Sequence, residues 1–339
     1  MIWLDNTRIL AIFAVVLLHV SGGVIVNSEW GSQAWWIGNI YNGFTRWCVP
    51  MFVMLSGALL LDSRKQESLT QFYRKRLSRI LWPLLFWSVF FSGWAWARGM
   101  VKGEPVHLLT LLNNLLTGKP NDHLWFLFMI LGLYLFTPFL RKVVAHSTHQ
   151  ELGFLTGATM AIVAVSYGHQ HIWPGAEGVP DLFITWFLLF IPFFLLGYWI
   201  RQDSQSFPQW LLWLIFILSG LATVGGYFGL GQWLNPAAGN YVYGYLSITV
   251  IPLSVSLMYL LKTWTIPICG ERYNRPLAAL TLGIYLIHPI FLETFNFLGY
   301  GAMAFHPLLS IPVITLVIFV LSAGIAWLMG QIPYVKRVI

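Results

Sequence analysis

The sequence predicts an all-α membrane protein that crosses the bilayer about ten times, with both termini in the cytoplasm. Of its 339 residues, 58% are hydrophobic and only 9% are charged, whereas an ordinary soluble domain carries about 25% charged residues. Its mean hydropathy is +0.70. The 18 Trp and 25 Phe residues fit many spans, because aromatic rings favour the boundary between membrane and water. With so little charge available to cover a soluble surface, most of the exterior must face lipid.

Ten segments match the length of a transmembrane helix, which needs about 20 predominantly apolar residues. They are residues 2–26, 41–61, 79–98, 123–140, 152–168, 182–200, 209–230, 241–261, 277–298 and 308–329. The fifth is short, and Tyr, Gly and Pro252 dilute the eighth. The first lacks a basic start and a cleavage site, which favours a span over a signal peptide. No linker or repeat divides the chain, so one domain is predicted over residues 1–339.

Three prolines inside these segments, Pro192, Pro252 and Pro289, predict helix kinks. Irregular backbone at membrane depth needs shelter from protein or from a water-filled cavity. The kinks would therefore lie beside other helices. A kink that serves packing alone is the alternative.

Basic residues concentrate in alternate loops, which predicts the orientation of the chain. One set of loops and the C-terminal tail holds Arg64, Lys65, Arg74, Lys75, Arg76, Arg79, Arg141, Lys142, Arg201, Lys262, Arg272, Arg275, Lys336 and Arg337, and the opposite loops hold only Arg98, Lys102 and Lys119. Cytoplasmic loops carry an excess of Lys and Arg, so the first set is placed in the cytoplasm. The same placement accounts for the net charge of +7 without a nucleic-acid partner.

Neither the cysteines nor the histidines form a metal-binding pattern. Cys48 and Cys269 are predicted to be free thiols. His169 and His171, in a predicted outer loop, have the spacing of a metal pair but no third ligand nearby. We therefore expect no metal.

Arg8 and His19 are ionisable residues inside the first predicted span, where a charge is costly and marks a functional candidate. They are eleven positions apart, close to three helical turns, so both project from nearly the same face, about 16 Å apart along the axis. This arrangement predicts a helix that lines a polar channel. The alternative is that Arg8 reaches the headgroups while His19 only hydrogen-bonds to a neighbouring helix.

Arg76 and Arg79 lie three positions apart at the cytoplasmic start of the third span, so they share one helix face. Two guanidinium groups placed in this way can clamp a phosphate through bidentate hydrogen bonds. The alternative is a cluster that sets topology and contacts lipid headgroups. That second interpretation is the one expected for the neighbouring Arg74 and Lys75.

The ninth predicted span carries Tyr285, His288 and Glu293. A carboxylate at membrane depth can orient an imidazole or accept a proton. His288 and Glu293 are five positions apart, which is a poor spacing for contact on a regular helix, although Pro289 would change that relation. A structural hydrogen bond is the alternative.

Asp122, His123 and Trp125 open the fourth span at its predicted periplasmic end. Sugars stack on aromatic faces and bond to acidic or imidazole groups, so these residues predict a site for a glycan. Ordinary anchoring of Trp at the interface is the alternative.

Five motifs, in order along nearly the whole chain, resemble the membrane-bound acyltransferase-3 family. Arg8 and His19 match its first-helix Arg-x10-His element, and residues 49–57 resemble its second-span phrase ending in Ser-Gly. Residues 76–79 resemble its Arg-x-x-Arg element, residues 123–127 its His-Leu-Trp-Phe element, and residues 283–288 its Ile-Tyr-x-x-His element. Residues 3–8 are similar to the opening of the group that contains the enterobacterial common antigen O-acetyltransferase. Ile9 departs from the family's usual Gly.

The resemblance implies an O-acyltransferase, most similar to O-acetyltransferases, with many spans in a bacterial inner membrane. It implies acetyl-CoA or another acyl-CoA as cytoplasmic donor, and a hydroxyl of a glycan or lipid-linked glycan as acceptor. On this basis Arg8, Arg76 and Arg79 are expected to bind the CoA phosphates. His19 would act as general base or as nucleophile, with Glu293 as a second catalytic candidate. The residues expected to bind the acceptor are Asp122, His123, Trp125, Tyr285 and His288.

A transporter or flippase for a lipid-linked sugar is the main alternative, because kinked spans and buried charge also suit that role. A glycan polymerase with a lipid-linked donor is a third possibility. The sequence shows no inverted repeat and no pair of corresponding broken helices. Ordered binding of acyl-CoA would favour the enzyme over both.

Overall fold

The computed structural model describes residues 1–62, 67–103, 107–118, 120–172 and 183–339, and these residues form helices and no β-strand. The helices are α1 (Ile2–Asn27), α2 (Gln33–Gly43), α3 (Cys48–Leu60), α4 (Leu69–Arg76), α5 (Ser78–Lys102), α6 (Leu108–Leu116), η1 (Asp122–Leu124), α7 (Trp125–Ala145), α8 (His149–Ile172), η2 (Phe183–Thr185), α9 (Trp186–Gln202), α10 (Gln209–Trp233), α11 (Pro236–Tyr243), α12 (Val250–Lys262), α13 (Gly270–Ala279), α14 (Thr281–Phe297), α15 (Pro307–Gln331) and η3 (Val335–Arg337). The predicted all-α class is confirmed.

Among the described residues, seven helical segments are long and apolar enough to cross a membrane, and an eighth is the bent pair α13–α14, with an angle of 68° at its break. The seven are Ile2–Asn27, Gln33–Leu60, Leu69–Val101, Asp122–Ala145, His149–Ile172, Gln209–Trp233 and Pro307–Gln331. Two shorter apolar helices, α9 and α12, lie where the sixth and eighth spans were predicted. Each of the ten predicted segments therefore contains an apolar helix.

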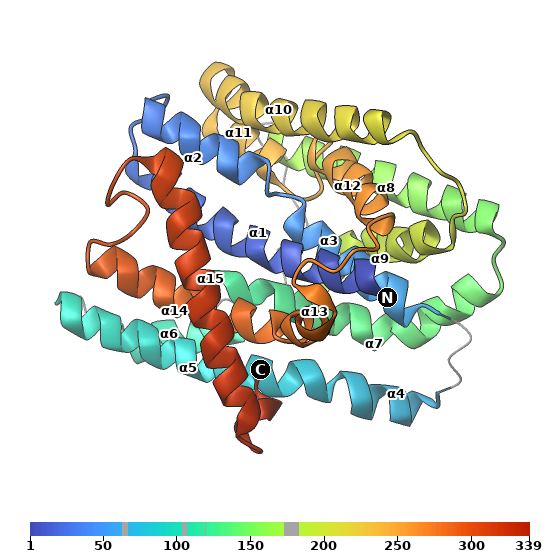
Figure 1. The fold of residues 1–339 in the computed structure, drawn as a ribbon, viewed down its shortest axis with the longest axis horizontal. Coiled ribbons are helices and arrows are strands. Elements are labelled where there is room, and N and C mark those ends of the chain that lie inside the picture. The colour runs from blue at the N-terminus through green and yellow to red at the C-terminus, as the bar shows by residue number, and fades with distance from the viewer. Residues whose placement is uncertain (63–66, 104–106, 119, 173–182) are drawn as a thin grey trace.

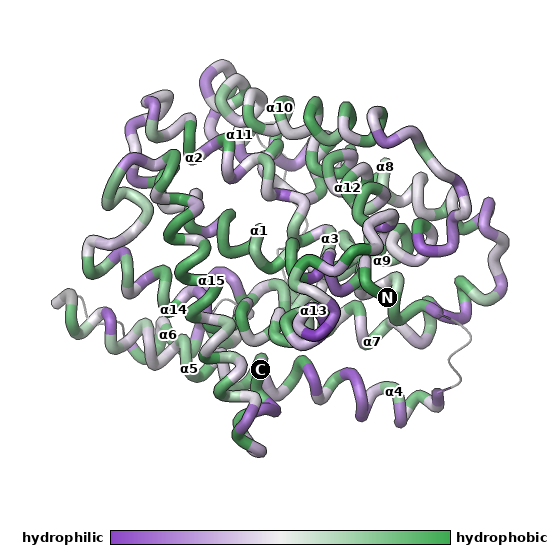
Figure 2. The backbone as a smooth tube through the Cα atoms, in the orientation of Figure 1, coloured by the Kyte–Doolittle hydropathy of each residue, from purple (hydrophilic) through white to green (hydrophobic). Residues whose placement is uncertain are grey.

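Large apolar side chains on the outer helices face away from the protein. Phe154 on α8, Leu218 on α10 and Leu316 on α15 are each more than half exposed, which is the behaviour of a lipid-facing surface. Figure 2 shows hydrophobic colour along α1, α10 and α15, and hydrophilic colour on α4 and α13. The distribution identifies a multi-pass membrane protein.

Helix α1 lies in the middle of the molecule, in contact with α2, α3, α13, α14 and α15 (Figure 1). Most of its central residues are buried, including Ile12 and Val16, which have no exposed surface. Because protein surrounds this helix, its polar side chains point toward other helices and the spaces between them.

Helices α3 and α9 pack with their backbones in contact. A Cβ atom added to Gly57 would collide with the carbonyl group of Phe194, and one added to Gly197 would collide with that of Met54. Small residues on both faces allow membrane helices to approach this closely. The Ser-Gly that ends the second-span phrase therefore has a packing role at Gly57.

Two local predictions need correction. Pro252 was expected to kink a span over 241–261, but α12 begins only at Val250, so this proline sits in its first turn, where backbone N–H groups lack helical partners and a proline costs little. His169 and His171 were expected in a loop, but they lie in the last turn of α8. The helices continue without interruption through Pro192 and Pro289.

Two arginines, Arg141 and Arg201, close the C-terminal end of α3. Arg141 Nε donates to the carbonyl oxygen of Leu60 at 2.6 Å, and Arg201 Nη1 donates to that of Ala58 at 2.5 Å. The last carbonyls of a helix have no helical donors and carry partial negative charge. We call Arg141 and Arg201 the α3 clamp.

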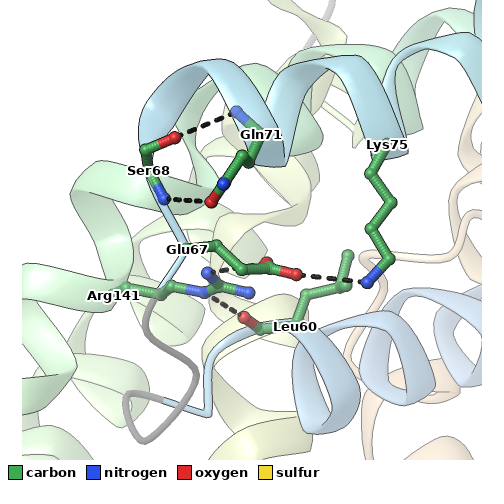
Figure 3. A network of polar contacts seen from close by, with 6 residues as sticks. All are labelled: Leu60, Glu67, Ser68, Gln71, Lys75 and Arg141. Atoms are coloured by element: carbon green, nitrogen blue, oxygen red, sulfur yellow. Dashed lines mark hydrogen bonds and ion pairs between the residues drawn. The ribbon is translucent and has the colours of Figure 1, made fainter.

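Carboxylates complete the α3 clamp. Glu67 Oε2 lies 3.5 Å from Arg141 Nη1, and Glu67 Oε1 lies 3.3 Å from Lys75 Nζ. Asp62 Oδ2 lies 3.7 Å from Arg201 Nη2. Figure 3 shows Glu67 between the two cations. Burial raises the pKa of the Glu67 carboxyl, but the Lys75 hydrogen bond and the nearby positive charges outweigh burial and hold that pKa below its ordinary value.

Candidate active site

One cavity of about 670 Å³ joins most of the predicted site residues. It lies between α1, α3, the α4–α5 junction, the start of α7, and α13–α14. The predicted residues that line it are Arg8, His19, Arg76, Arg79, His123, Trp125 and Tyr285. The face of α1 that carries Arg8 and His19 therefore borders an internal cavity, as a polar channel requires.

Four arginines line this cavity, and all four were predicted at the cytoplasmic side of the membrane: Arg8, Arg76, Arg79 and Arg275. We call them the arginine mouth. Within the part of the chain that the structure describes, Asp5 is the only carboxylate in ion-pair distance of the group, with its Oδ1 3.3 Å from Arg8 Nη1. Arg76 Nε is buried without a hydrogen-bond partner. The mouth thus carries an excess of positive charge and an unmatched donor, a combination that suits an anion such as phosphate.

A small amide network brings Arg275 to the mouth. Asn274 Nδ2 donates to Asn6 Oδ1 at 2.9 Å, and Asn6 Nδ2 donates to the carbonyl oxygen of Ile266 at 2.8 Å. These bonds fix the start of α1 against α13. Within the phrase at residues 3–8, Asp5 therefore holds Arg8 while Asn6 docks the helix that carries the fourth arginine.

His19 is oriented by its own helix. Its Nδ1 lies 2.8 Å from the carbonyl oxygen of Val15, and because a carbonyl can only accept, Nδ1 carries the proton. Nε2 is then left with its lone pair. Since the His19 ring borders the cavity, this arrangement suits a group that accepts a proton there.

Pro289 explains the position of the His288 ring. A proline has no N–H, so Pro289 leaves the carbonyl of Tyr285 without its helical donor. His288 Nδ1 donates to that carbonyl oxygen at 2.7 Å. Nε2 of His288 is buried without a partner. The proline and histidine together satisfy the backbone and point a free imidazole nitrogen into the protein.

Three imidazole rings from three segments form a cluster. The ring centroids of His19 and His288 are 5.0 Å apart, and those of His123 and His288 are 5.8 Å apart. His123 Nδ1 donates to Asn121 Oδ1 at 2.8 Å, and its Nε2 is buried and unpartnered. The Tyr285 hydroxyl donates to the backbone oxygen of His123, which fixes the start of α7 against α14. His288 supports the cluster but does not line the cavity.

Three predicted residues are absent from the lining of this cavity: His288, which contacts His19 and His123 from outside it, Glu293 and Asp122. Glu293 accepts a hydrogen bond from Trp94 Nε1 at 2.6 Å and pairs with Arg98 at 2.9 Å. These contacts border a separate cavity of about 520 Å³ between α5 and α14. Glu293 follows His288 by five positions, which is a rotation of about 140° around a helix. Because α14 is continuous at Pro289, the side chains of His288 and Glu293 point in different directions.

Sequence reasoning missed several cavity residues. Arg275 was counted only toward topology, and Ser56, Tyr134 and Tyr245 were not singled out, yet all four line the cavity. Arg46, inside the second predicted span, was also missed, although an ionisable residue at membrane depth is itself a signal. No group of His, Cys, Asp and Glu in the described ranges is arranged to hold a metal ion.

Comparison with known proteins identifies the family. No curated protein and no solved structure matches the chain. The sequence model of the acyltransferase-3 family, described as an acyltransferase domain, matches residues 1–330, which is nearly the whole chain and includes every residue of the arginine mouth and the histidine cluster. The chain therefore belongs to the acyltransferase-3 family and is a multi-pass membrane acyltransferase.

Proposed function

We propose that this protein is an O-acyltransferase of the bacterial inner membrane. It moves an acyl group, in the first instance acetyl, from cytoplasmic acyl-CoA to a hydroxyl of a surface glycan or glycan precursor. The observation that supports this best is the cavity that connects four arginines to His19. The opening at residues 3–8 also favours the group related to the enterobacterial common antigen O-acetyltransferase.

The arginine mouth is the proposed site for the CoA phosphates. Guanidinium and phosphate are opposite in charge and form bidentate hydrogen bonds, and Arg76 Nε has no hydrogen-bond acceptor within the protein. With the phosphates there, an extended pantetheine arm would run along α1. Arg8 and His19 are about 16 Å apart along the helix axis, so the thioester would reach the imidazole.

His19 Nε2 is the proposed general base. It takes the proton of the acceptor hydroxyl while the hydroxyl oxygen attacks the thioester carbonyl. The new ester C–O bond forms, the C–S bond breaks, and the imidazolium returns the proton to the CoA thiolate. The bond from Nδ1 to the Val15 carbonyl keeps Nδ1 protonated, so Nε2 is the nitrogen that accepts the proton and returns it. His123 and Trp125, which line the cavity at the start of α7, are the proposed contacts of the acceptor.

Family membership favours an enzyme over a transporter, flippase or polymerase. Those functions do not require a cavity lined by an unmatched arginine and an oriented imidazole. Transport of a glycan without any requirement for CoA would reverse this preference.

Transfer of labelled acetyl from acetyl-CoA to the glycan fraction of membranes tests the proposal. His19→Gln is expected to reduce the rate by about 10²- to 10⁴-fold, the usual contribution of a general base. His146→Gln is the matched control, because His146 is exposed at the C-terminal end of α7 and does not line the cavity. Mass analysis of glycans from cells with and without the protein should differ by one acetyl group. Wild-type rates in His19→Gln at equal protein level would refute the assignment.

A further inference from the structure

A second cavity, of about 420 Å³, adjoins the first and is walled mainly by aromatic rings. The residues that matter here are Arg46, Trp125, Tyr167, Trp186, Tyr243 and Tyr245. Arg46 lies between α2 and α3, and the aromatic residues come from the start of α7, the last turns of α8, the start of α9, and the end of α11 and the residues after it. All of these lie on the predicted outer side of the membrane, opposite the arginine mouth.

Trp125 and Tyr245 line both cavities. Their rings stack with centroids 5.8 Å apart and an interplanar angle of 19°. This ring pair forms a shared wall, and His123, two residues before Trp125, borders the first cavity. A ligand in the second cavity therefore contacts the same two rings that line the first cavity.

Arg46 supplies an unneutralised positive charge in the second cavity. Its Nε donates to Asn42 Oδ1 at 2.8 Å, its Nη2 donates to the same oxygen, and its Nη1 donates to the Tyr243 carbonyl at 3.1 Å. The guanidinium lies 4.0 Å from the centroid of the Tyr243 ring. Within the described ranges of the chain, it has no carboxylate in ion-pair distance. A guanidinium has five N–H donors, so donors remain for a ligand.

The position of Arg46 is fixed relative to the imidazole of His19. Asn42, which holds the guanidinium, donates through Nδ2 to the carbonyl oxygen of Leu18 at 2.8 Å. Leu18 is the residue before His19. One side chain therefore connects the cation of the second cavity to the helix turn that carries the proposed base.

We propose that the second cavity is an acceptor subsite for an acidic sugar. The pyranose ring stacks on the aromatic wall, and its carboxylate pairs with Arg46. The reacting hydroxyl of the acceptor then extends past Trp125 and Tyr245 toward His19. This assignment rests on the proposed function for the transfer step, but binding of the sugar does not depend on CoA or on catalysis.

Saturation-transfer NMR on the purified full-length protein in detergent tests the subsite. The probes are methyl β-D-glucuronide and methyl β-D-glucoside, which differ in the carboxylate. We expect the glucuronide to bind at least about tenfold more tightly, as a charge-assisted hydrogen bond allows. Arg46→Gln should abolish this preference.

A second variant protects the test against misfolding of Arg46→Gln. Asn240 is an exposed residue of the cavity rim, and Asn240→Asp adds a negative charge without removing the Arg46 contacts. It should weaken binding of the glucuronide and leave binding of the glucoside unchanged. Asn27→Asp, at the end of α1, is the matched control and should change the binding of neither glycoside. Asn235 is not a suitable control, because its side chain caps α11 by accepting a hydrogen bond from the Ala238 N–H.

The outcomes separate the subsite from the proposed function. If the protein binds the glucuronide more tightly than the glucoside but transfers no acyl group, the subsite is supported and the proposed transferase function is refuted. Acyl transfer with equal binding of both glycosides would overturn the subsite. A co-purifying phospholipid that occupies the cavity in native mass spectra, and that neither glycoside displaces, would also overturn it.

Discussion

The arginine mouth and the α3 clamp are both built from arginine side chains, but these side chains have different partners. In the clamp, Arg141 and Arg201 donate to helix carbonyls and pair with Glu67 and Asp62. In the mouth, Asp5 pairs with Arg8, and no described carboxylate lies in ion-pair distance of Arg76, Arg79 or Arg275. Arg76 Nε in the mouth and Arg141 Nη2 in the clamp are both buried without a hydrogen-bond partner, so the two groups differ in the carboxylates around them. Matched charges stabilise a fold, whereas unmatched charges at membrane depth are costly and mark a place for a ligand.

The comparison predicts that mutations in the two groups of arginines change different properties of the protein. Loss of a clamp arginine should lower stability and leave the affinity for CoA intact. Loss of a mouth arginine should lower the affinity for CoA and change stability much less.

Arg141→Gln should have the largest effect on stability. It leaves Glu67 partly buried with one cation fewer and frees the carbonyl of Leu60. Breaking a buried pair in this way costs about 3 kcal/mol. Thermal unfolding in lipid nanodiscs measures the loss. A wild-type unfolding temperature in Arg141→Gln would show that the clamp is not structural.

Arg76→Gln should weaken CoA binding about 30-fold, because a charge-assisted hydrogen bond contributes about 2 kcal/mol. Its unfolding temperature should fall much less than that of Arg141→Gln, since Arg76 Nε has no hydrogen-bond partner to lose and Arg76 contributes only one of the positive charges near Glu67. Calorimetric titration with CoA measures the affinity.

Arg74→Gln is the matched control for Arg76, because Arg74 lies on the same helix but outside the cavity. It should bind CoA as the wild type does. Equal losses of affinity in Arg74→Gln and Arg76→Gln would mean that general positive charge, and not the mouth, attracts CoA.

Asp203 gives the smallest predicted effect, and it depends on pH. Burial raises the pKa of this carboxyl, but hydrogen bonds from the Gln205 N–H and the Tyr259 hydroxyl, with the Lys262 charge, hold that pKa below its ordinary value. Such a group stabilises the fold at pH values above its unfolded pKa, and this stabilisation is lost as pH falls through the lower folded pKa.

Between pH 5 and pH 3, a range that brackets the ordinary Asp pKa of about 4, Asp203→Asn should therefore lose less stability than the wild type does. At neutral pH it should cost about 1 kcal/mol, the value of one hydrogen bond. Unfolding temperatures across this pH range measure both effects. An unchanged pH dependence in the variant would exclude this role for Asp203.

The parts of the site that follow helix periodicity were predictable from the sequence. Arg8 and His19 share a face because eleven residues make about three turns, and the apolar surroundings made both stand out. The ten apolar segments were found from the length of their apolar runs, which a membrane span requires. The eighth was misjudged because a loop and α11 occupy the residues before Val250.

The missed parts depend on tertiary contacts. Arg275 resembles a topology-setting arginine until the Asn6–Asn274 bond docks α13 against α1. The meeting of His19, His123 and His288 joins residues far apart in sequence. Glu293 was assigned to the same site because it is close in sequence, but helix rotation carries it to Arg98.

A density map of the protein with an unreactive acetyl-CoA analogue would test the central claim most directly. The account predicts the analogue's phosphates on Arg8, Arg76 and Arg79, and its thioester mimic within hydrogen-bond reach of His19 Nε2. An analogue bound elsewhere, or one that enters the arginine mouth but turns away from the imidazole, would contradict it.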